Sequence, residues 1–158
     1  MNDTFQKAFT ELIGNEGSYT VDDGGATMWG ITESVARANG YTGDMHVLPL
    51  ATAQTIAKSQ YWDKYQCDQF DPRVAFQVLD AAYNGGHPAQ WLQQAVGIKV
   101  DGVIGAQTIA AVRSADPIKV ILKFDAYRLQ YMSGLQVWPT YSKGWANRIA
   151  NNMVAAAT

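Results

Sequence analysis

Residues 16–32 read EGSYTVDDGGATMWGIT. Four glycines interrupt this stretch and alternate with aromatic and β-branched residues, a pattern typical of an irregular loop or a short β-hairpin. The segments on both sides carry helical patterns instead. The stretch therefore predicts a small β-hairpin near the amino terminus of a mainly helical chain, and its polar side chains are where we expect chemistry.

Helical spacing is clear before the loop and after it. Apolar residues from Phe5 to Ile13 repeat at intervals of three and four, and Gly14 predicts the end of this first helix. Asp71-Pro72 and Asp116-Pro117 each predict a helix start, because proline lacks the N–H that the first turn leaves unused. Further helices are predicted over residues 33–39, 51–64, 72–83, 88–96, 106–113, 117–133 and 139–156.

Composition limits the class of protein. The chain has 158 residues, of which 47% are hydrophobic and 16% charged, so it can bury roughly 70% of its unfolded surface in one folded domain. The net charge of -2 lacks the basic excess that nucleic-acid binding requires. The sequence contains no repeat and no linker, so it predicts one domain. We also expect a monomer.

Several kinds of site are not expected. Cys67 is the single cysteine, which excludes an internal disulfide and a cysteine-rich zinc site. His46 and His87 have no partner at metal-ligand spacing, so we expect neither a metal nor a cofactor. No apolar run reaches the ~20 residues of a membrane helix, and the first residues do not resemble a signal peptide. Stable membrane insertion is therefore not expected.

The chain has only three glutamates, and one of them stands out. Glu11 lies opposite the apolar face of its helix, and Glu33 falls in the first turn of another, where a negative charge is favourable. Glu16 follows a predicted helix end and has apolar and aromatic neighbours in sequence. Such surroundings disfavour the ionised carboxylate, so Glu16 could hold a proton near neutral pH. The alternative, an exposed loop glutamate, is the commoner case.

Asp22 and Asp23 follow immediately before Gly24-Gly25, where a turn can bring them back toward Glu16. Two carboxyl groups across a cleft are what glycoside hydrolysis requires, since one protonates the leaving oxygen and the other activates water or attacks. Thr27 could hold a water molecule through its hydroxyl. The alternatives are ordinary Asp-Gly turn chemistry and an ordinary hairpin threonine.

These residues carry a family resemblance. Residues 16–32 resemble the E-G-G-Y, D and G-G-x-T-x-x-G-I-T signature of phage-type N-acetylmuramidases, glycoside hydrolase family 108. Tyr61-Trp62 and the stretches 80–86 and 91–93 are similar to the Y-W, D-x-A-x-N-x-G and W-L-Q blocks of that family. In the last third, the resemblance to the segment described as the peptidoglycan-binding region of the family rests on residues 100–105, Thr108, Arg128 and 144–149.

The resemblance implies a fold and a division of the chain. It implies a mainly α, lysozyme-like α+β fold, in which the hairpin forms one wall of the active-site cleft. It further implies a single catalytic domain over residues 1–158, with a catalytic part at 1–98 and a helical peptidoglycan-binding-like part at 99–158.

The resemblance also implies an activity and its residues. The expected reaction is hydrolysis of the β-1,4 bond between N-acetylmuramic acid and N-acetylglucosamine in peptidoglycan, with Glu16 as the general acid. Asp23 is predicted as the second carboxylate, and the Thr27 hydroxyl is predicted to help orient the water molecule. The loop departs from the family pattern at Ser18 and is about three residues shorter, so Asp22 stays an alternative to Asp23.

Substrate binding calls for aromatic and amide side chains. We predict this role for Tyr19, Asp22, Trp29 and Asn84, although Asn84 can equally be a helix C-cap. Trp62, Trp91, Trp138 and Trp145 are assigned to the core because they lie in apolar helical patterns.

The expected biological setting follows from the family alone. It is that of an endolysin, which waits in the host cytoplasm and reaches the periplasm through a holin, with glycan strands of bacterial peptidoglycan as its partner. A non-catalytic wall-binding module and a lytic transglycosylase are the alternative functions.

Overall fold

The computed structural model describes residues 2–16 and 18–158, apart from the side chains of residues 15 and 16. The chain packs into two compact units, residues 1–64 and 65–158, and each is described by itself. The predicted single domain with a division at residue 98 stays a prediction.

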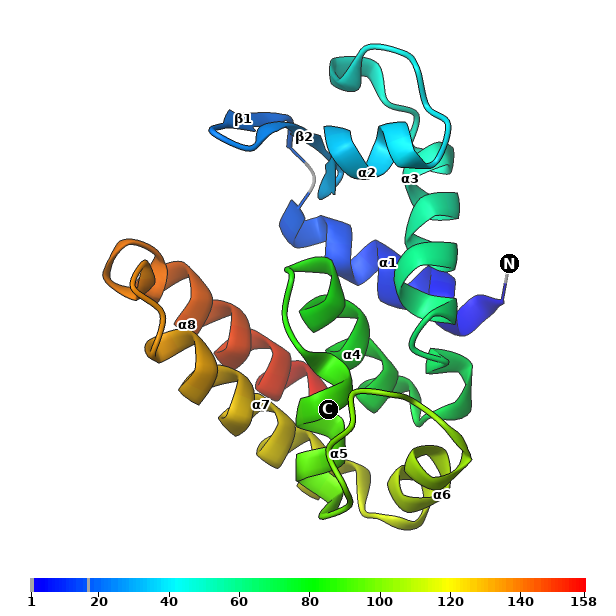
Figure 1. Ribbon diagram of the computed structural model, residues 1–158, viewed down its shortest axis with the longest axis vertical. Coiled ribbons are helices and arrows are strands. Elements are labelled where there is room, and N and C mark those ends of the chain that lie inside the picture. Colours follow the sequence, from blue (N-terminus) through cyan, green and yellow to red (C-terminus); the bar gives the residue numbers. More distant parts are fainter. Residues whose placement is uncertain (1, 17) are drawn as a thin grey trace. The chain divides into compact units, whose positions relative to one another are not determined.

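The first unit combines helices with a small sheet (Figure 1). Helix α1 precedes the sheet and α2 follows it directly. The elements are α1 (Asp3–Glu16), β1 (Thr20–Asp22), β2 (Gly25–Met28), β3 (Ile31–Thr32), α2 (Glu33–Ala38), the 3₁₀ turn η1 (Met45–Val47), α3 (Leu50–Ala57) and the π-helical turn η2 (Lys58–Asp63) that continues α3.

Aromatic residues form the core of this unit. Phe5, Phe9 and Leu12 lie on one face of α1 and are almost fully buried. The Phe5 ring meets Trp62 edge to face, with ring centroids 5.4 Å apart. Trp62 is fully buried, which confirms its predicted place in the core. Burial of such side chains supplies ~1.5–3 kcal/mol each, so this cluster holds α1 against η2.

The end of α1 differs from the prediction. The helix continues two residues past Gly14 and ends at Glu16, so Gly14 does not stop it. Glycine inside a helix costs only about 1 kcal/mol relative to alanine, and the buried residues earlier in α1 offset that cost. Glu16 therefore belongs to the carboxyl end of a helix instead of to the following loop.

The sheet confirms the predicted hairpin. Its three strands are antiparallel in the order β1-β2-β3. Thr27 on β2 pairs with Thr20 on one side and with Thr32 on the other. Because side chains alternate along a strand, the three threonines share one face, while Ile31 points to the opposite face and is fully buried. One face of the sheet is thus polar, and on the other face Ile31 is buried whereas Val21 is exposed.

The second unit is entirely helical in its regular structure. Helix α7 contacts α4, α5, α6 and α8, and α7 and α8 lie side by side (Figure 1). The elements are the 3₁₀ turn η3 (Cys67–Gln69), α4 (Pro72–Tyr83), α5 (Pro88–Val96), α6 (Ala106–Ser114), α7 (Pro117–Ser133) and α8 (Trp138–Ala156).

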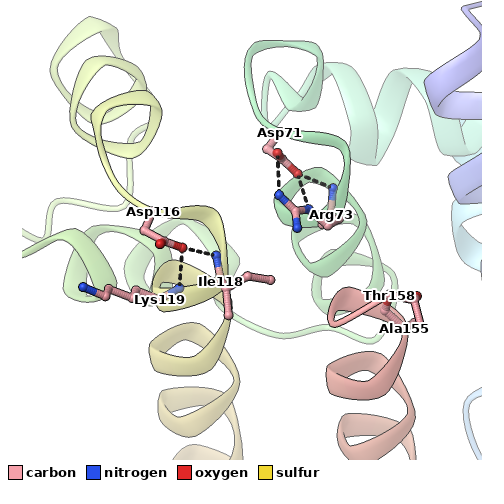
Figure 2. Close-up of polar contacts among 7 residues, drawn as sticks. All are labelled: Asp71, Arg73, Asp116, Ile118, Lys119, Ala155 and Thr158. Carbon is pink, nitrogen blue, oxygen red and sulfur yellow. Dashed lines mark hydrogen bonds and ion pairs between the residues drawn. The ribbon is translucent and has the colours of Figure 1, made fainter.

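Two Asp-Pro pairs begin α4 and α7 as predicted. Figure 2 shows how the two aspartates cap these helices. An oxygen of Asp71 accepts the Arg73 N–H at 2.9 Å, and the same carboxylate pairs with the Arg73 guanidinium. Asp116 accepts the N–H groups of Ile118 at 2.9 Å and Lys119 at 3.3 Å. Asp71 thereby satisfies one first-turn donor of α4, and Asp116 satisfies two of α7.

The fold class is confirmed as a mainly α, lysozyme-like α+β fold with a small antiparallel sheet near the amino terminus. In the part of the chain that the structure describes, no helix has the length and apolar character needed to cross a membrane.

Candidate active site

Glu16, the predicted general acid, is the last residue of α1. Its side chain lies outside the described residues, as does the whole of Gly17. The backbone of residue 16 nevertheless places it four residues before β1, so the predicted acid and the hairpin belong to the same unit.

Thr27 and Asp22 share the polar face of the hairpin. Thr27 pairs with Thr20, and Asp22 lies two residues after Thr20 on the same strand. Residues two apart on a strand point to the same side, so Asp22 and Thr27 lie on the same face of the hairpin, one same-face position apart in register. Thr27 is half-buried and Asp22 is exposed. The structure therefore places a carboxylate-bearing and a hydroxyl-bearing residue on one face of the hairpin.

Asp23 occupies the tip of the same hairpin. Asp22 pairs with Gly25, which leaves Asp23 and Gly24 as the two turn residues. One oxygen of Asp22 accepts the Gly24 N–H at 2.8 Å, which is the turn interaction that the sequence suggested as the alternative. Gly25 has φ +103°, a conformation that side-chain-bearing residues rarely adopt, so the turn depends on glycine there.

Two predicted binding residues are held by contacts within the first unit. Tyr19 stacks on His46 of η1, with ring centroids 4.5 Å apart and planes 6° from parallel. The Trp29 indole N–H donates to the Leu48 carbonyl at 2.9 Å. Trp29 also has φ +54°, in the left-handed region that is costly for a bulky residue. Such strain persists where the surroundings enforce it, often at binding sites.

Asn84, the fourth predicted binding residue, lies in the second unit and caps α4. Its side-chain amide donates to the Asp80 carbonyl at 2.7 Å, as expected for the helix C-cap alternative. Asn84 also lines a pocket of about 140 Å³, which we call the arginine pocket. Its walls are Ala81, Asn84, Gly85, Gly86, Trp91, Arg128, Tyr131, Met132, Leu135, Trp145 and Arg148.

A buried ion cluster supports the arginine pocket. The fully buried Asp80 carboxylate accepts hydrogen bonds from Arg128 at 2.6 Å, Arg148 at 2.9 Å and Asn152 at 2.8 Å. Burial disfavours the charged form of Asp80, but the two guanidinium groups outweigh burial and hold its pKa below the usual value. Asp80 thus ties α4 to α7 and α8 and fixes both arginines at the pocket wall.

Asp125 is the second buried carboxyl group of this region. It is 1% exposed, and neither carboxyl oxygen has a hydrogen-bond partner. Burial raises the pKa of Asp125 to about 7, with Arg128 opposing the rise and Asp80 adding to it. A group of this kind is uncharged in mildly acidic solution, which matters for the charge of the cluster.

The predicted binding motif at residues 100–105 has an internal role. Its Asp101 and Gly102 N–H groups donate to the buried Gln93 side chain at 3.1 and 3.0 Å. The Gln93 amide in turn donates to Asp101 at 2.8 Å and to the Thr108 hydroxyl at 3.1 Å. These polar groups therefore shape the loop between α5 and α6.

The prediction for the tryptophans is partly wrong. Trp91 is buried as expected, whereas Trp138 and Trp145 are half-buried. Trp145 stacks on the exposed Tyr141, with ring centroids 5.3 Å apart, and lines the arginine pocket. Helical spacing identifies a shared face but does not show whether a neighbouring helix covers all of it.

The sequence did not single out Arg128, Arg148 or Tyr131 as site residues. The first two stand inside family-like motifs, and an arginine within an apolar helical pattern is the signal that could have marked them. Among the described residues, no three His, Cys, Asp or Glu side chains gather closely enough to hold a metal ion.

The chain is similar to a known family and to a solved structure. The family model for glycosyl hydrolase 108 matches residues 9–86. A solved structure, that of Brucella abortus SagA, is 33% identical and superposes with a TM-score of 0.88, covering 98% of this chain and 94% of that one. The chain belongs to the glycosyl hydrolase 108 family. It is accordingly a glycoside hydrolase, of a family whose substrate is peptidoglycan. No curated protein matches the chain.

Within the glycosyl hydrolase 108 match lie Glu16, the hairpin and Asn84. The match ends at Gly86, so α5 to α8 lie beyond it, whereas the SagA structure corresponds over nearly the whole chain.

Proposed function

We propose that this glycosyl hydrolase 108 protein is a muramidase that hydrolyses the β-1,4 bond between N-acetylmuramic acid and N-acetylglucosamine, with Glu16 as its general acid. The observation that carries this proposal is the family match over residues 9–86, which spans Glu16 and the hairpin. The position of residue 16 at the carboxyl end of α1 adds support, because a helix disfavours negative charge at that end.

The hairpin supplies the second part of the mechanism. A carboxylate at the end of β1 or in the turn would stabilise the positive charge that develops on the sugar ring, and the Thr27 hydroxyl would hold the attacking water. Sequence spacing favours Asp23 for this role. The shared face with Thr27 makes Asp22 an equal candidate. Water held by a threonine favours inversion at the anomeric carbon.

Tyr19 and Trp29 would contact the glycan strand. Both rings are fixed by contacts within the first unit, so binding would cost little side-chain ordering. In this proposal the protein acts on the wall as an endolysin released through a holin, a setting that comes from the family resemblance alone.

Product analysis tests the reaction. We expect soluble muropeptides with a reducing end, each one water heavier than the 1,6-anhydro product of a lytic transglycosylase. Mass spectrometry of fragments released from purified Gram-negative peptidoglycan separates the two. Anhydro products would show that the enzyme is a lytic transglycosylase and not a hydrolase. Binding to peptidoglycan without release of fragments would favour a non-catalytic wall-binding module.

A further inference from the structure

We propose that the arginine pocket binds a carboxylate of the peptide stem of peptidoglycan. This proposal rests on the proposed function and extends it, because it assigns a part of the substrate other than the cleaved sugar bond. Three properties of the pocket support it: its size, its charge and its walls.

The size of the pocket favours a small group. About 140 Å³ is close to the volume of a protein cavity that takes up one benzene molecule. An N-acetylated sugar ring has more than twice as many heavy atoms as benzene. The pocket therefore fits the end of a peptide, such as a terminal carboxylate with its methyl-bearing carbon, better than a whole saccharide.

The charge of the pocket favours an anion. Arg128 and Arg148 both line it, and Asp80 is the carboxylate that pairs with both. Asp125 is largely uncharged in mildly acidic solution, since burial raises its pKa to about 7. Two guanidinium groups then face one carboxylate. A carboxylate ligand would balance the remaining positive charge, which is costly in a buried cluster.

The walls favour a group that is anionic at one end and apolar beside it. Trp91 and Tyr131 form one side, with ring centroids 5.6 Å apart, and His87 contacts both rings. The Tyr131 hydroxyl is 3.2 Å from a ring nitrogen of His87. Arg148 is the more accessible arginine, with 17% of its side chain exposed against 3% for Arg128. We therefore expect Arg148 to make the direct contact.

Binding of a matched pair of short peptides tests this inference at pH 6. The probes are N-acetyl-D-alanyl-D-alanine, which has a free carboxylate, and its C-terminal amide. Nuclear magnetic resonance of the intact chain would follow the indole N–H signals of Trp91 and Trp145, with the fully buried Trp62 as internal control. We expect saturable shifts of the two pocket signals with the acid and at least about tenfold weaker binding of the amide, because charge-assisted hydrogen bonds are the stronger kind.

Equal binding of acid and amide would overturn the carboxylate assignment in favour of a neutral polar group. Absence of shifts with either probe would overturn the site itself. Inorganic phosphate is the competing anion: if it displaces the peptide at equal concentration, the pocket is a general anion site and the assignment to a peptide carboxylate is wrong.

Variants locate the contact and separate the two proposals. Arg148→Gln should weaken binding of the acid at least about fivefold, whereas Arg148→Lys should keep part of it, since lysine retains the charge but not the planar fork. The acid and amide comparison in the unmodified protein needs no variant, so it decides the matter even if Arg148→Gln fails to fold. Glu16→Gln should bind the acid normally while losing cleavage. If the protein cleaves peptidoglycan but binds acid and amide equally, only the pocket inference is wrong. If it prefers the acid but does not cleave peptidoglycan, only the proposed function is wrong.

Discussion

At the scale of single residues, Asp125 makes the stability of the protein depend on pH. Its pKa rises from an ordinary 3.8 to about 7 because it is buried without a hydrogen-bond partner. Between these two values the folded state binds more protons than the unfolded state, so stability falls as pH rises from about 4 to 7. The full cost of holding the charged group at neutral pH is on the order of 4 kcal/mol.

We therefore expect Asp125→Asn to be more stable than the unmodified protein by about 1–3 kcal/mol at pH 8, with the difference shrinking toward pH 4. Urea denaturation at several pH values measures it. Asp23→Asn, at an exposed turn position, controls for the loss of one negative charge. An equal gain at pH 4 and pH 8 would show that titration of Asp125 is not the cause.

The choice between Asp22 and Asp23 also belongs to this scale. Asp22 shares the face of Thr27, and its turn bond to the Gly24 N–H can be kept by asparagine. If Asp22 is the second carboxylate, Asp22→Asn should lower kcat about 10²-fold or more without loss of stability, whereas Asp23→Asn should change it little. The opposite ranking in kcat would establish Asp23, as the sequence spacing predicts.

At the scale of elements, the hairpin and α1 respond oppositely to the same substitution. Gly25 has φ +103°, so Gly25→Ala strains the turn and should cost about 1 kcal/mol or more. Gly14 is inside α1, and an added methyl group would meet nothing within 4 Å. Gly14→Ala should therefore stabilise the protein by up to about 1 kcal/mol.

Thermal unfolding of Gly25→Ala and Gly14→Ala measures these two changes in stability. We expect the midpoint to fall by roughly 2–4 °C for Gly25→Ala and to rise by a similar amount for Gly14→Ala. A fall in both would indicate that Gly14 is required by something other than the helix.

Element boundaries were predictable where local chemistry determines them. The Asp-Pro pairs place the starts of α4 and α7 correctly, because the cap and the proline act within one turn. The end of α1 was not predictable in the same way. Gly14 is a weak helix breaker, and whether the helix continues through it depends on packing elsewhere in the unit.

At the scale of the whole molecule, the candidate site was predictable only in part. The hairpin residues and Glu16 are close in sequence, so a single sequence motif contains them and can predict them as a site. The ion cluster behind the arginine pocket joins Asp80 to partners 48, 68 and 72 residues away. No local pattern pairs such residues, and the uncovered part of α8 that bears Trp145 likewise depends on how the helices pack.

Two structural roles lie outside what the motifs alone suggested. The segment at residues 100–105, which resembles a binding region, arranges its polar groups around Gln93. The arginines from the other motifs hold Asp80 and line the pocket. The family-like motifs thus include residues that shape a loop and residues that line the pocket. Only the packing of the second unit shows which residue has which role.

We propose that this glycoside hydrolase uses Glu16 as the acid that cleaves peptidoglycan. The most direct measurement is the rate of release of reducing-end muropeptides from purified peptidoglycan by the unmodified protein and by Glu16→Gln, with Glu11→Gln as the matched control on the same helix. Glutamine keeps the shape of the side chain but cannot donate the proton. We predict that Glu16→Gln loses at least 10²-fold in kcat while still binding peptidoglycan, and that Glu11→Gln cleaves normally. Cleavage by Glu16→Gln at the unmodified rate would contradict the account.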